Sequence, residues 1–284
     1  MKNPINDNAE TGPPPAQPDV SEPGWQILMA CDIRPQLAAN AGVKKLYLQG
    51  TLVSILGHPG SAKTFVALDL LAHHVTGTPW RGHRVNKGAA LAVLLEGGSG
   101  AQNRLWAQLQ SGLLTAGAPL KILIGSIDLC HDDVHARKII QIAKQLALDT
   151  GEPIVAILID TLAMSFAGGD ENGKDMNAVV NNLRLICNAT GASVLLIHHL
   201  GKDPSKGARG HSSLWGAMDS ELVITGQTGR RTITVKKQRD LEHLETMPFE
   251  LEVVPVGVDE DGDSITTCII KQGLRDFVWV KRAA

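Results

Sequence analysis

The sequence has little of what marks a secreted, membrane-spanning or zinc-binding protein. Its four cysteines, Cys31, Cys130, Cys187 and Cys268, are widely scattered and form no C-x-x-C pair. This distribution argues against a zinc ribbon or a disulfide scaffold and favours a reducing compartment. No apolar run approaches the roughly 20 residues that a membrane-spanning helix needs, and no basic-then-apolar signal pattern opens the chain. We therefore expect a cytoplasmic protein with no membrane partner.

A surplus of positive charge is also missing. The formal net charge is -2 and the sequence pI is about 6.5, so the chain as a whole is not a polycation that coats nucleic acid. Any contact with DNA has to come from local loops. The length of 284 residues suits one well-buried α/β domain with appendages.

The N-terminal part differs in composition from the rest. Residues 1–24 hold six prolines and hardly any apolar anchor, which predicts a disordered, proline-rich tail. Residues 25–50 include Ile27, Leu28 and Leu46, which can pack on a domain, and we interpret them as a linker or a subunit-docking segment. Residues 51–284 are expected to form the main domain.

From residue 51 onward, apolar runs alternate with helical patterns. Near-continuous apolar runs are typical of parallel strands buried on both faces, and strands alternating with helices predict a doubly wound sheet. Ligands then bind at the carboxyl ends of the strands. The expected strands cover residues 52–56, 89–95, 120–124, 154–159, 193–197, 231–237 and the final stretch 265–280, and the expected helices cover residues 64–75, 102–110, 134–148 and 175–190.

The segment GHPGSAKT, Gly57 to Thr64, lies between the first strand and the first helix. In that context it predicts a phosphate-binding loop, because backbone N–H groups and the helix dipole converge on a phosphate at the helix N-terminus. Lys63 would reach the β and γ phosphates of ATP, and the Thr64 hydroxyl would hold Mg²⁺. The cofactor-binding residues are expected to be Gly57, His58, Pro59, Gly60, Ser61, Ala62, Lys63, Thr64 and Phe65. Ala62 departs from the pattern, which has glycine before the lysine.

Two carboxylates follow neighbouring apolar runs. Asp160 ends the run from Val155 to Ile159, the form of a Walker B strand, and is the candidate for the Mg²⁺ side of the site. Glu96 follows the run from Ala90 to Leu95 and opens a glycine turn, so it is the candidate that orients or deprotonates the attacking water. Helix capping or plain solvation is the alternative for Glu96.

A histidine pair, His198-His199, follows the apolar run Ser193 to Ile197. A metal site is disfavoured because no further ligand follows at metal spacing. Side chains alternate along a strand, so one histidine of the pair is expected to face the nucleotide and sense its γ-phosphate.

Two cationic segments come next. The glycine-rich loop Gly201 to Ser213 carries Lys202, Lys206, Arg209 and His211 and is either a DNA-binding loop or a solvated surface loop. The acidic, glycine-rich loop 167–175 is a weaker candidate for DNA. Farther on, Lys237 and Arg239 end a strand and project to the same side, where they could reach a neighbouring subunit's γ-phosphate as an arginine finger does.

Taken in order, these motifs resemble the RecA-like ATPases, and most closely the RepA family of plasmid and phage replicative helicases. The resemblance covers roughly residues 45 to 245 and is carried by GHPGSAKT, the strand before Glu96, Asp160-Thr161, LLIHHLGKD from Leu195, ARGHSS from Ala208 and VKKQRD from Val235. It implies a RecA-like P-loop core with antiparallel strands near the C-terminus, and a hexameric ring that translocates on single-stranded DNA with ATP and Mg²⁺.

Position by position, the resemblance implies Walker A roles for Lys63 and Thr64, the catalytic glutamate at Glu96 and the Walker B aspartate at Asp160. It implies the phosphate sensor at His199 or His198 and the finger at Arg239 or Arg209, and it adds a replication initiator or a primase as a partner. Two other functions stay open: a regulatory or loader ATPase that does not unwind DNA, and a nucleotide-binding scaffold in which Ala62 makes turnover weak.

Overall fold

The computed structural model describes residues 29–33, 40–170, 173, 175–200, 212–226, 229–239 and 246–271. The chain divides into two compact units, residues 1–37 and 38–284. The described part of the first unit holds a short 3-10 turn, η1 (Ala30–Asp32). Residues 40–50 fall in the second unit, where Val43, Leu46 and Tyr47 are buried in its core. The core of the main unit thus takes in part of the segment that composition assigns to a linker.

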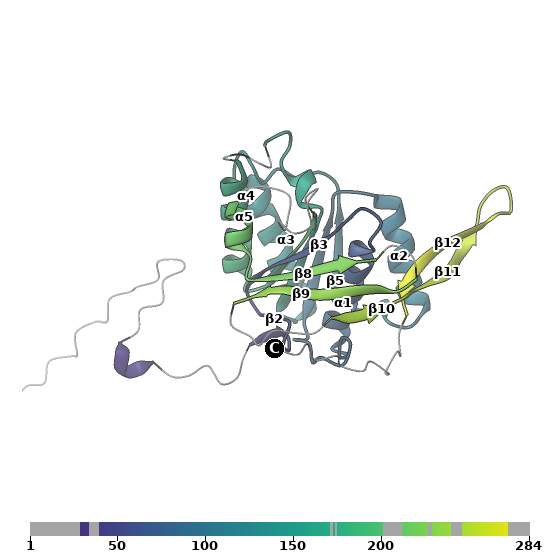
Figure 1. The fold of residues 1–284 in the computed structure, drawn as a ribbon, viewed down its shortest axis with the longest axis horizontal. Coiled ribbons are helices and arrows are strands. Elements are labelled where there is room, and N and C mark those ends of the chain that lie inside the picture. The colour runs from purple at the N-terminus through teal and green to yellow at the C-terminus, as the bar shows by residue number, and fades with distance from the viewer. Residues whose placement is uncertain are drawn as a thin grey trace, which may run out of the picture. The chain divides into compact units, whose positions relative to one another are not determined.

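The main unit is built on an eight-stranded sheet with the strand order β10-β9-β8-β3-β7-β6-β4-β5 (Figure 1). The six strands from β8 to β5 pair in parallel, whereas β9 and β10 pair antiparallel at the other edge. This confirms the expected α/β fold class with antiparallel strands near the C-terminus. The bounds are β3 (Leu52–Gly57), β4 (Ala89–Leu94), β5 (Leu120–Ile124), β6 (Ile154–Asp160), β7 (Ser193–His199), β8 (Ser220–Thr225), β9 (Arg231–Gln238) and β10 (Met247–Phe249).

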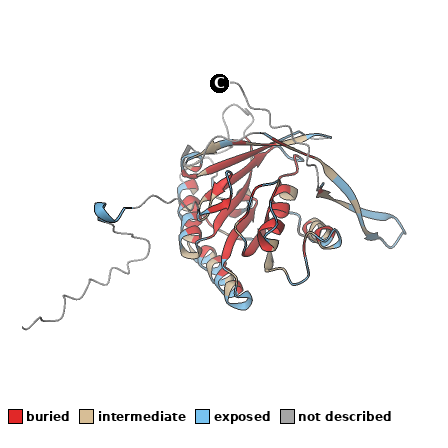
Figure 2. Ribbon diagram, turned by 90° about the horizontal axis from the view of Figure 1, so that it is seen from below, coloured by how far each residue is buried: buried red, intermediate tan, exposed pale blue. Residues whose placement is uncertain are grey.

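Helices cover both faces of the sheet because the central strands carry apolar side chains on both faces (Figure 2). Along β4, Ala90, Ala92 and Leu94 belong to one core cluster, whereas Leu91 and Val93 belong to the other. The first cluster lies under α1 (Lys63–Thr76) and α2 (Gly98–Gln110). The second lies under α3 (Val134–Thr150), α4 (Asp175–Thr190) and the short α5 (Ser212–Ala217).

Several predicted boundaries are wrong by a few residues. The second helix begins at Gly98 rather than Gln102, and β4 ends at Leu94 rather than Leu95. β6 and β7 extend through Asp160 and His199, because Asp160 pairs with Ile197 and His199 pairs with Gly57. Pairing between strands, which no single segment reveals, decides where each strand stops.

Two small sheets complete the main unit. β1 (Ala41–Val43) pairs with β2 (Tyr47–Leu48), and β11 (Leu251–Val258) pairs with β12 (Ser264–Ile270) as a hairpin. The hairpin extends away from the large sheet, and its outer part is exposed (Figure 2). The final predicted strand, 265–280, corresponds to β12 as far as Ile270, and residues 272–280 lie outside the described part. None of the helices in the described ranges is long and apolar enough to cross a membrane.

Candidate nucleotide site

The predicted phosphate loop links β3 to α1. A Cβ atom added at Gly57 would lie 2.8 Å from the Ile224 carbonyl oxygen and 2.4 Å from the Ser61 hydroxyl, so the close approach of β8 requires glycine there. Gly60 has a φ of +76°, a left-handed conformation that costs glycine little. These two glycines turn the backbone so that the loop ends at the N-terminus of α1, where N–H groups have no partner inside the helix.

Ala62 occupies the one loop position where the sequence departs from the phosphate-loop pattern. Its φ of 77° and ψ of 26° place it in the left-handed region, immediately before the first residue of α1. An L-residue with a Cβ pays roughly 1–2 kcal/mol in this conformation. The backbone therefore follows the turn that glycine normally makes, and alanine makes it under strain.

Lys63 folds back onto the loop. Its ammonium group donates to the carbonyl oxygens of Gly57 and His58, at 3.0 Å each, and the side chain is only 7% exposed. Burial lowers the pKa of Lys63, while the carboxylates of Asp160 and Glu96 act in the opposite direction. A buried ammonium group held by loop carbonyls suits the phosphate contact that was predicted for it.

Asp160 and Thr64 meet at the tip of β6. The Thr64 hydroxyl donates to an Asp160 carboxylate oxygen at 2.8 Å. Burial raises the pKa of Asp160, and nearby Glu96 raises it further, while Thr64, Arg104 and Lys63 lower it. A hydroxyl and a carboxylate in contact are the oxygen ligands that Mg²⁺ accepts beside phosphates.

Glu96 lies beside the same strand tip. The hydroxyl of Thr161, next to Asp160, donates to Glu96 Oε1 at 2.7 Å. Glu96 is exposed, whereas Asp160 is 4% exposed. The two carboxylates thus have different surroundings, as separate roles on the metal side and the water side would require.

His199 is the histidine of the pair that reaches the loop. Its Nδ1 lies 3.5 Å from the Lys63 ammonium nitrogen, and it is partly exposed. His198 is buried and, by the alternation of side chains along β7, points to the other face of the sheet. The strand geometry therefore puts His199, rather than His198, beside the phosphate loop.

Sequence reasoning missed Arg104, on α2. Its guanidinium carbon lies 4.7 Å from the centre of the Phe65 ring, and its charge lowers the pKa of Asp160. Phe65 thus packs against Arg104, and Arg104 in turn acts on Asp160. Arg104 is the only basic residue between Lys87 and Lys121, and it lies in the helix that follows Glu96. A single cation at that place in the sequence is the signal that could have marked it as a site residue.

The residues gathered here fit a magnesium-bound nucleoside triphosphate. Gly57 admits no Cβ, and Ser61 is 2% exposed, with a buried hydroxyl that has no hydrogen-bond partner among the described residues. Thr64 with Asp160 supplies oxygen ligands. Such a nucleotide would supply a phosphoanhydride bond to be hydrolysed. Lys63 and the loop N–H groups would bind the phosphates, and Glu96 would take a proton from water.

Lys237 and Arg239 lie at the opposite end of the sheet from the phosphate loop. Ser220 pairs with both Val53 and Gln238, whereas Ile224 pairs with Gly57. The four steps along the strand from Ser220 to Ile224 span roughly 13 Å at about 3.3 Å per residue. Lys237 and Arg239, here called the cation pair, thus lie away from the phosphate loop of their own subunit.

Helix α5 holds this cation pair. Lys237 donates to the Trp215 carbonyl, and its ammonium group lies 4.3 Å from the centre of the Trp215 ring. Arg239 donates to the Gly216 carbonyl and forms an ion pair with Asp219 at 3.2 Å. Burial lowers the pKa of Lys237, and Arg239 lowers it further.

The predicted DNA-binding residues lie outside the described residues. These are Lys202, Lys206, Arg209 and His211. The segment that carries them, 201–211, connects Leu200, the residue after β7, to the start of α5 at Ser212. It therefore joins, along the chain, the strand of His199 to the helix that holds Lys237 and Arg239.

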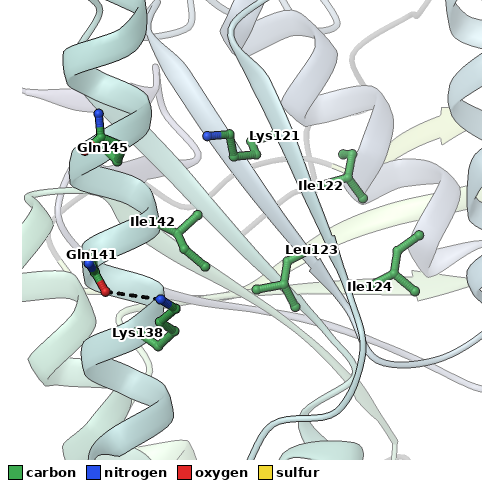
Figure 3. A pocket seen from close by; sticks show the side chains of 8 residues that line it. All are labelled: Lys121, Ile122, Leu123, Ile124, Lys138, Gln141, Ile142 and Gln145. Atoms are coloured by element: carbon green, nitrogen blue, oxygen red, sulfur yellow. Dashed lines mark hydrogen bonds between the residues drawn. The ribbon is translucent and has the colours of Figure 1, made fainter.

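A groove lies elsewhere, between β5 and α3 (Figure 3). It has a volume of about 500 Å³ and is lined by Lys121, Ile122 and Leu123 of the strand and by Lys138 and Ile142 of the helix. β5 is the edge strand, separated from β3 by β7, β6 and β4. The groove is therefore not part of the nucleotide site.

Comparisons with known proteins give a family and one similar solved structure. A family model described as an AAA domain matches residues 32–205, more than half of the chain. No curated protein matches the sequence significantly. Among solved structures, a KaiC-like protein from the hyperthermophilic archaeon Pyrococcus horikoshii OT3 is similar, with 14% sequence identity, a TM-score of 0.49, and coverage of 82% of this chain and 94% of that one.

Proposed function

The chain belongs to the AAA domain family with a RecA-like P-loop ATPase fold, and from this premise we propose that it is a ring-forming motor. In this proposal it hydrolyses ATP with Mg²⁺, translocates on single-stranded DNA and acts as a replicative helicase of the plasmid and phage type. The RepA-like order of motifs and the ring are part of the proposal.

One observation carries the proposal. The phosphate loop and the Lys237–Arg239 pair lie at opposite ends of the same sheet. A head-to-tail contact brings unlike ends together, so the pair of one subunit would complete the site of the next and stabilise charge on the transferred phosphate. Repeating that contact with a closing rotation gives a ring.

DNA contact is assigned to the segment from Gly201 to Ser213, which carries the cations Lys202 and Lys206. Replacing both with alanine should weaken binding of single-stranded DNA and lower its salt dependence by about one phosphate contact per cation. Basal ATP hydrolysis should persist. Binding titrations of labelled oligonucleotide at several salt concentrations measure both, and an unchanged slope would assign the segment to ordinary surface.

The decisive experiment measures ATP hydrolysis with and without single-stranded DNA, together with strand displacement on a forked duplex. We expect DNA-stimulated hydrolysis and displacement by the wild type, and binding of ATP without turnover by Glu96→Gln. Lys63→Ala should lose nucleotide binding as well. Hydrolysis without displacement would favour the regulatory or loader ATPase, and nucleotide binding without hydrolysis would favour the scaffold, for which the strain at Ala62 is the specific support.

A further inference from the structure

The β11–β12 hairpin exposes apolar side chains that an isolated ribbon cannot bury. Val253 is 66% exposed, Val258 is 71% exposed and Ile265 is 38% exposed. Residues 253–256 read Val-Val-Pro-Val, so both faces of the ribbon carry apolar groups. Its base joins the core through Leu251 and Ile270. A two-stranded ribbon of this kind is marginally stable in water, which indicates that another surface covers it.

The turn at the end of the hairpin is strongly acidic. Residues 259–263 contain four carboxylates and no cation, and all five residues are exposed. The Asp259 carboxylate organises the turn by accepting the N–H groups of Asp261 at 3.1 Å and Asp263 at 2.9 Å. Glu260 and Asp261 extend the negative charge along the exposed turn. A surface that covers the ribbon and meets this turn should therefore be basic.

The hairpin and the cation pair belong to opposite ends of the subunit. Phe249 of β10 pairs with Arg231, the first residue of β9, and the hairpin starts two residues later at Leu251. Lys237 lies near the other end of β9. In Figure 1 the hairpin is at the right and α5 is at the left. Helix α2, which starts just after Glu96, packs on both hairpin strands, so the hairpin shares the nucleotide end.

The other end of the subunit carries an exposed basic corner, Lys44, Lys45 and Arg84. These residues are neighbours because the N–H of Lys44 donates to the Arg84 carbonyl at 2.8 Å. The corner adjoins the cation pair, since the Gln238 amide donates to the Lys45 carbonyl at 2.6 Å. The basic corner and the residues that would reach a neighbour's phosphate thus share one end of the subunit, on opposite faces of the sheet.

We propose that the hairpin of one subunit docks on the basic corner of the next copy of this chain. This rests on the head-to-tail contact of the proposed function, which faces the nucleotide end of one subunit with the Lys237–Arg239 end of another. The acidic turn meets Lys44, Lys45 and Arg84, and the apolar ribbon is covered by the neighbour. The hairpin then acts as a clasp that orients the cation pair toward the adjoining site.

The test is a charge exchange read out by self-association. One variant carries Glu260→Lys and Asp261→Lys, leaving Asp259 to organise the turn. The other carries Lys44→Glu and Arg84→Glu, and a third combines all four changes. Sedimentation velocity with ATP and Mg²⁺ over a range of concentrations gives the association constants. Each double variant should associate at least about tenfold more weakly, and the combined variant should recover most of the loss, because its charges are again complementary.

A matched control places the same charge change elsewhere. Lys138 and Lys144 are exposed on α3, so Lys138→Glu with Lys144→Glu repeats the charge change of the second variant away from the basic corner. It should leave association unchanged. Val258→Ser, near the turn and away from the core, should also weaken association without changing the thermal melting temperature.

The outcomes separate this docking from other arrangements. A weakened hairpin variant with an unaffected corner variant would assign the hairpin to another partner, such as a second hairpin, and overturn the proposal. So would a combined variant weaker than either parent. The readout is assembly rather than hydrolysis, so the two proposals can fail separately. Charge rescue in a protein without ATPase activity would contradict the motor function and support the docking. DNA-stimulated ATPase activity without charge rescue would support the motor function and contradict the docking.

Discussion

At the residue scale, Ala62 shows how local conformation and residue type can conflict at a binding loop. Its left-handed backbone is the conformation that glycine adopts freely, and the loop imposes it on alanine. The surroundings keep the strain in place, because Gly57 at the start of the loop and Gly60, two residues before Ala62, fix the path of the chain. The residue that breaks the sequence pattern is therefore a source of strain inside an otherwise regular turn.

We expect Ala62→Gly to stabilise the protein by about 0.5–1 kcal/mol in the absence of nucleotide. Removing left-handed strain gains roughly 1–2 kcal/mol, and the added freedom of glycine in the unfolded chain offsets about 0.4–1 kcal/mol. Urea denaturation measures the change. Ala178→Gly, in the right-handed helix α4, is the control and should lose about 1 kcal/mol. A similar loss for Ala62→Gly would show that the left-handed conformation costs alanine nothing here.

His74 makes the stability of the protein depend on pH. Its Nδ1 donates to the Asn86 carbonyl at 2.7 Å, so its Nε2 accepts from the Tyr47 hydroxyl at 2.6 Å in the neutral form. Burial lowers the pKa of His74 to about 4. Between that value and the ordinary pKa of about 6.5, the unfolded chain binds more protons than the folded one. Stability therefore rises with pH across this window and falls on acidification.

The expected loss from this one group is about 3 kcal/mol between pH 6.5 and pH 4. The measurement is the free energy of unfolding of wild type and His74→Gln at several pH values. Glutamine can still bond Tyr47 and Asn86 but does not titrate, so the variant should show a smaller slope in this window. Parallel curves for the two proteins would assign the acid sensitivity to other groups.

At the element scale, α5 is a short helix with an outsized set of contacts. The Trp215 carbonyl accepts a hydrogen bond from Lys237, whose ammonium group also lies over the Trp215 ring. The Gly216 carbonyl accepts a hydrogen bond from Arg239. Arg184 of α4 also donates to the Ala217 carbonyl at 3.0 Å. Six residues therefore tie together β9, α4 and the cation pair. The position of α5 in turn sets where the pair lies.

If Lys237 acts on a neighbour's phosphate, Trp215→Ala should lower kcat by about two- to fivefold, because an exposed cation–π contact is worth roughly 0.5–1 kcal/mol. KM should stay the same, since the phosphate loop is untouched. Trp215→Phe should keep most of the activity because it retains a ring. Trp106→Ala, which removes another exposed tryptophan on α2, serves as the control. Steady-state kinetics that show equal losses in both alanine variants would remove Trp215 from positioning.

At the scale of the whole molecule, the phosphate loop and Arg239 lie at opposite ends of the subunit. Mixing two variants therefore tests whether Arg239 acts in the site of a neighbouring subunit. Arg239→Ala and Lys63→Ala subunits should each be inactive alone, one through its finger and the other through its loop. In a one-to-one random mixture, about a quarter of the interfaces pair an intact loop with an intact Arg239, so about a quarter of wild-type activity should return. Hydrolysis is measured after assembly has been verified by sedimentation. No recovery at any ratio would place Arg239 outside the neighbour's site.

Much of this molecule follows from local sequence patterns. The apolar runs predict β3, β4, β6 and β7, because strands buried on both faces have no polar side, and they also predict the half-buried edge strand β5. The loop GHPGSAKT between a strand and a helix indicates a phosphate site, and the rule that parallel strands end on one edge brings Glu96 and Asp160 to it. The strands are confirmed because they depend on the period of a segment, and the two carboxylates lie together because parallel strands share one direction. The phosphate site itself stays a prediction.

Only the tertiary structure decided the rest, because those features depend on which segments pair. The choice of His199 beside Lys63 needs the register of β7 on β3, and the role of Arg104 needs the face of α2 that meets Phe65. The separation of Lys237 from the loop needs the antiparallel pairing of β9 with β8. The projecting hairpin needs its own pairing of β11 with β12 outside the large sheet. Sequence determines what each strand can bury, and pairing between distant strands determines which end of the molecule each charge occupies.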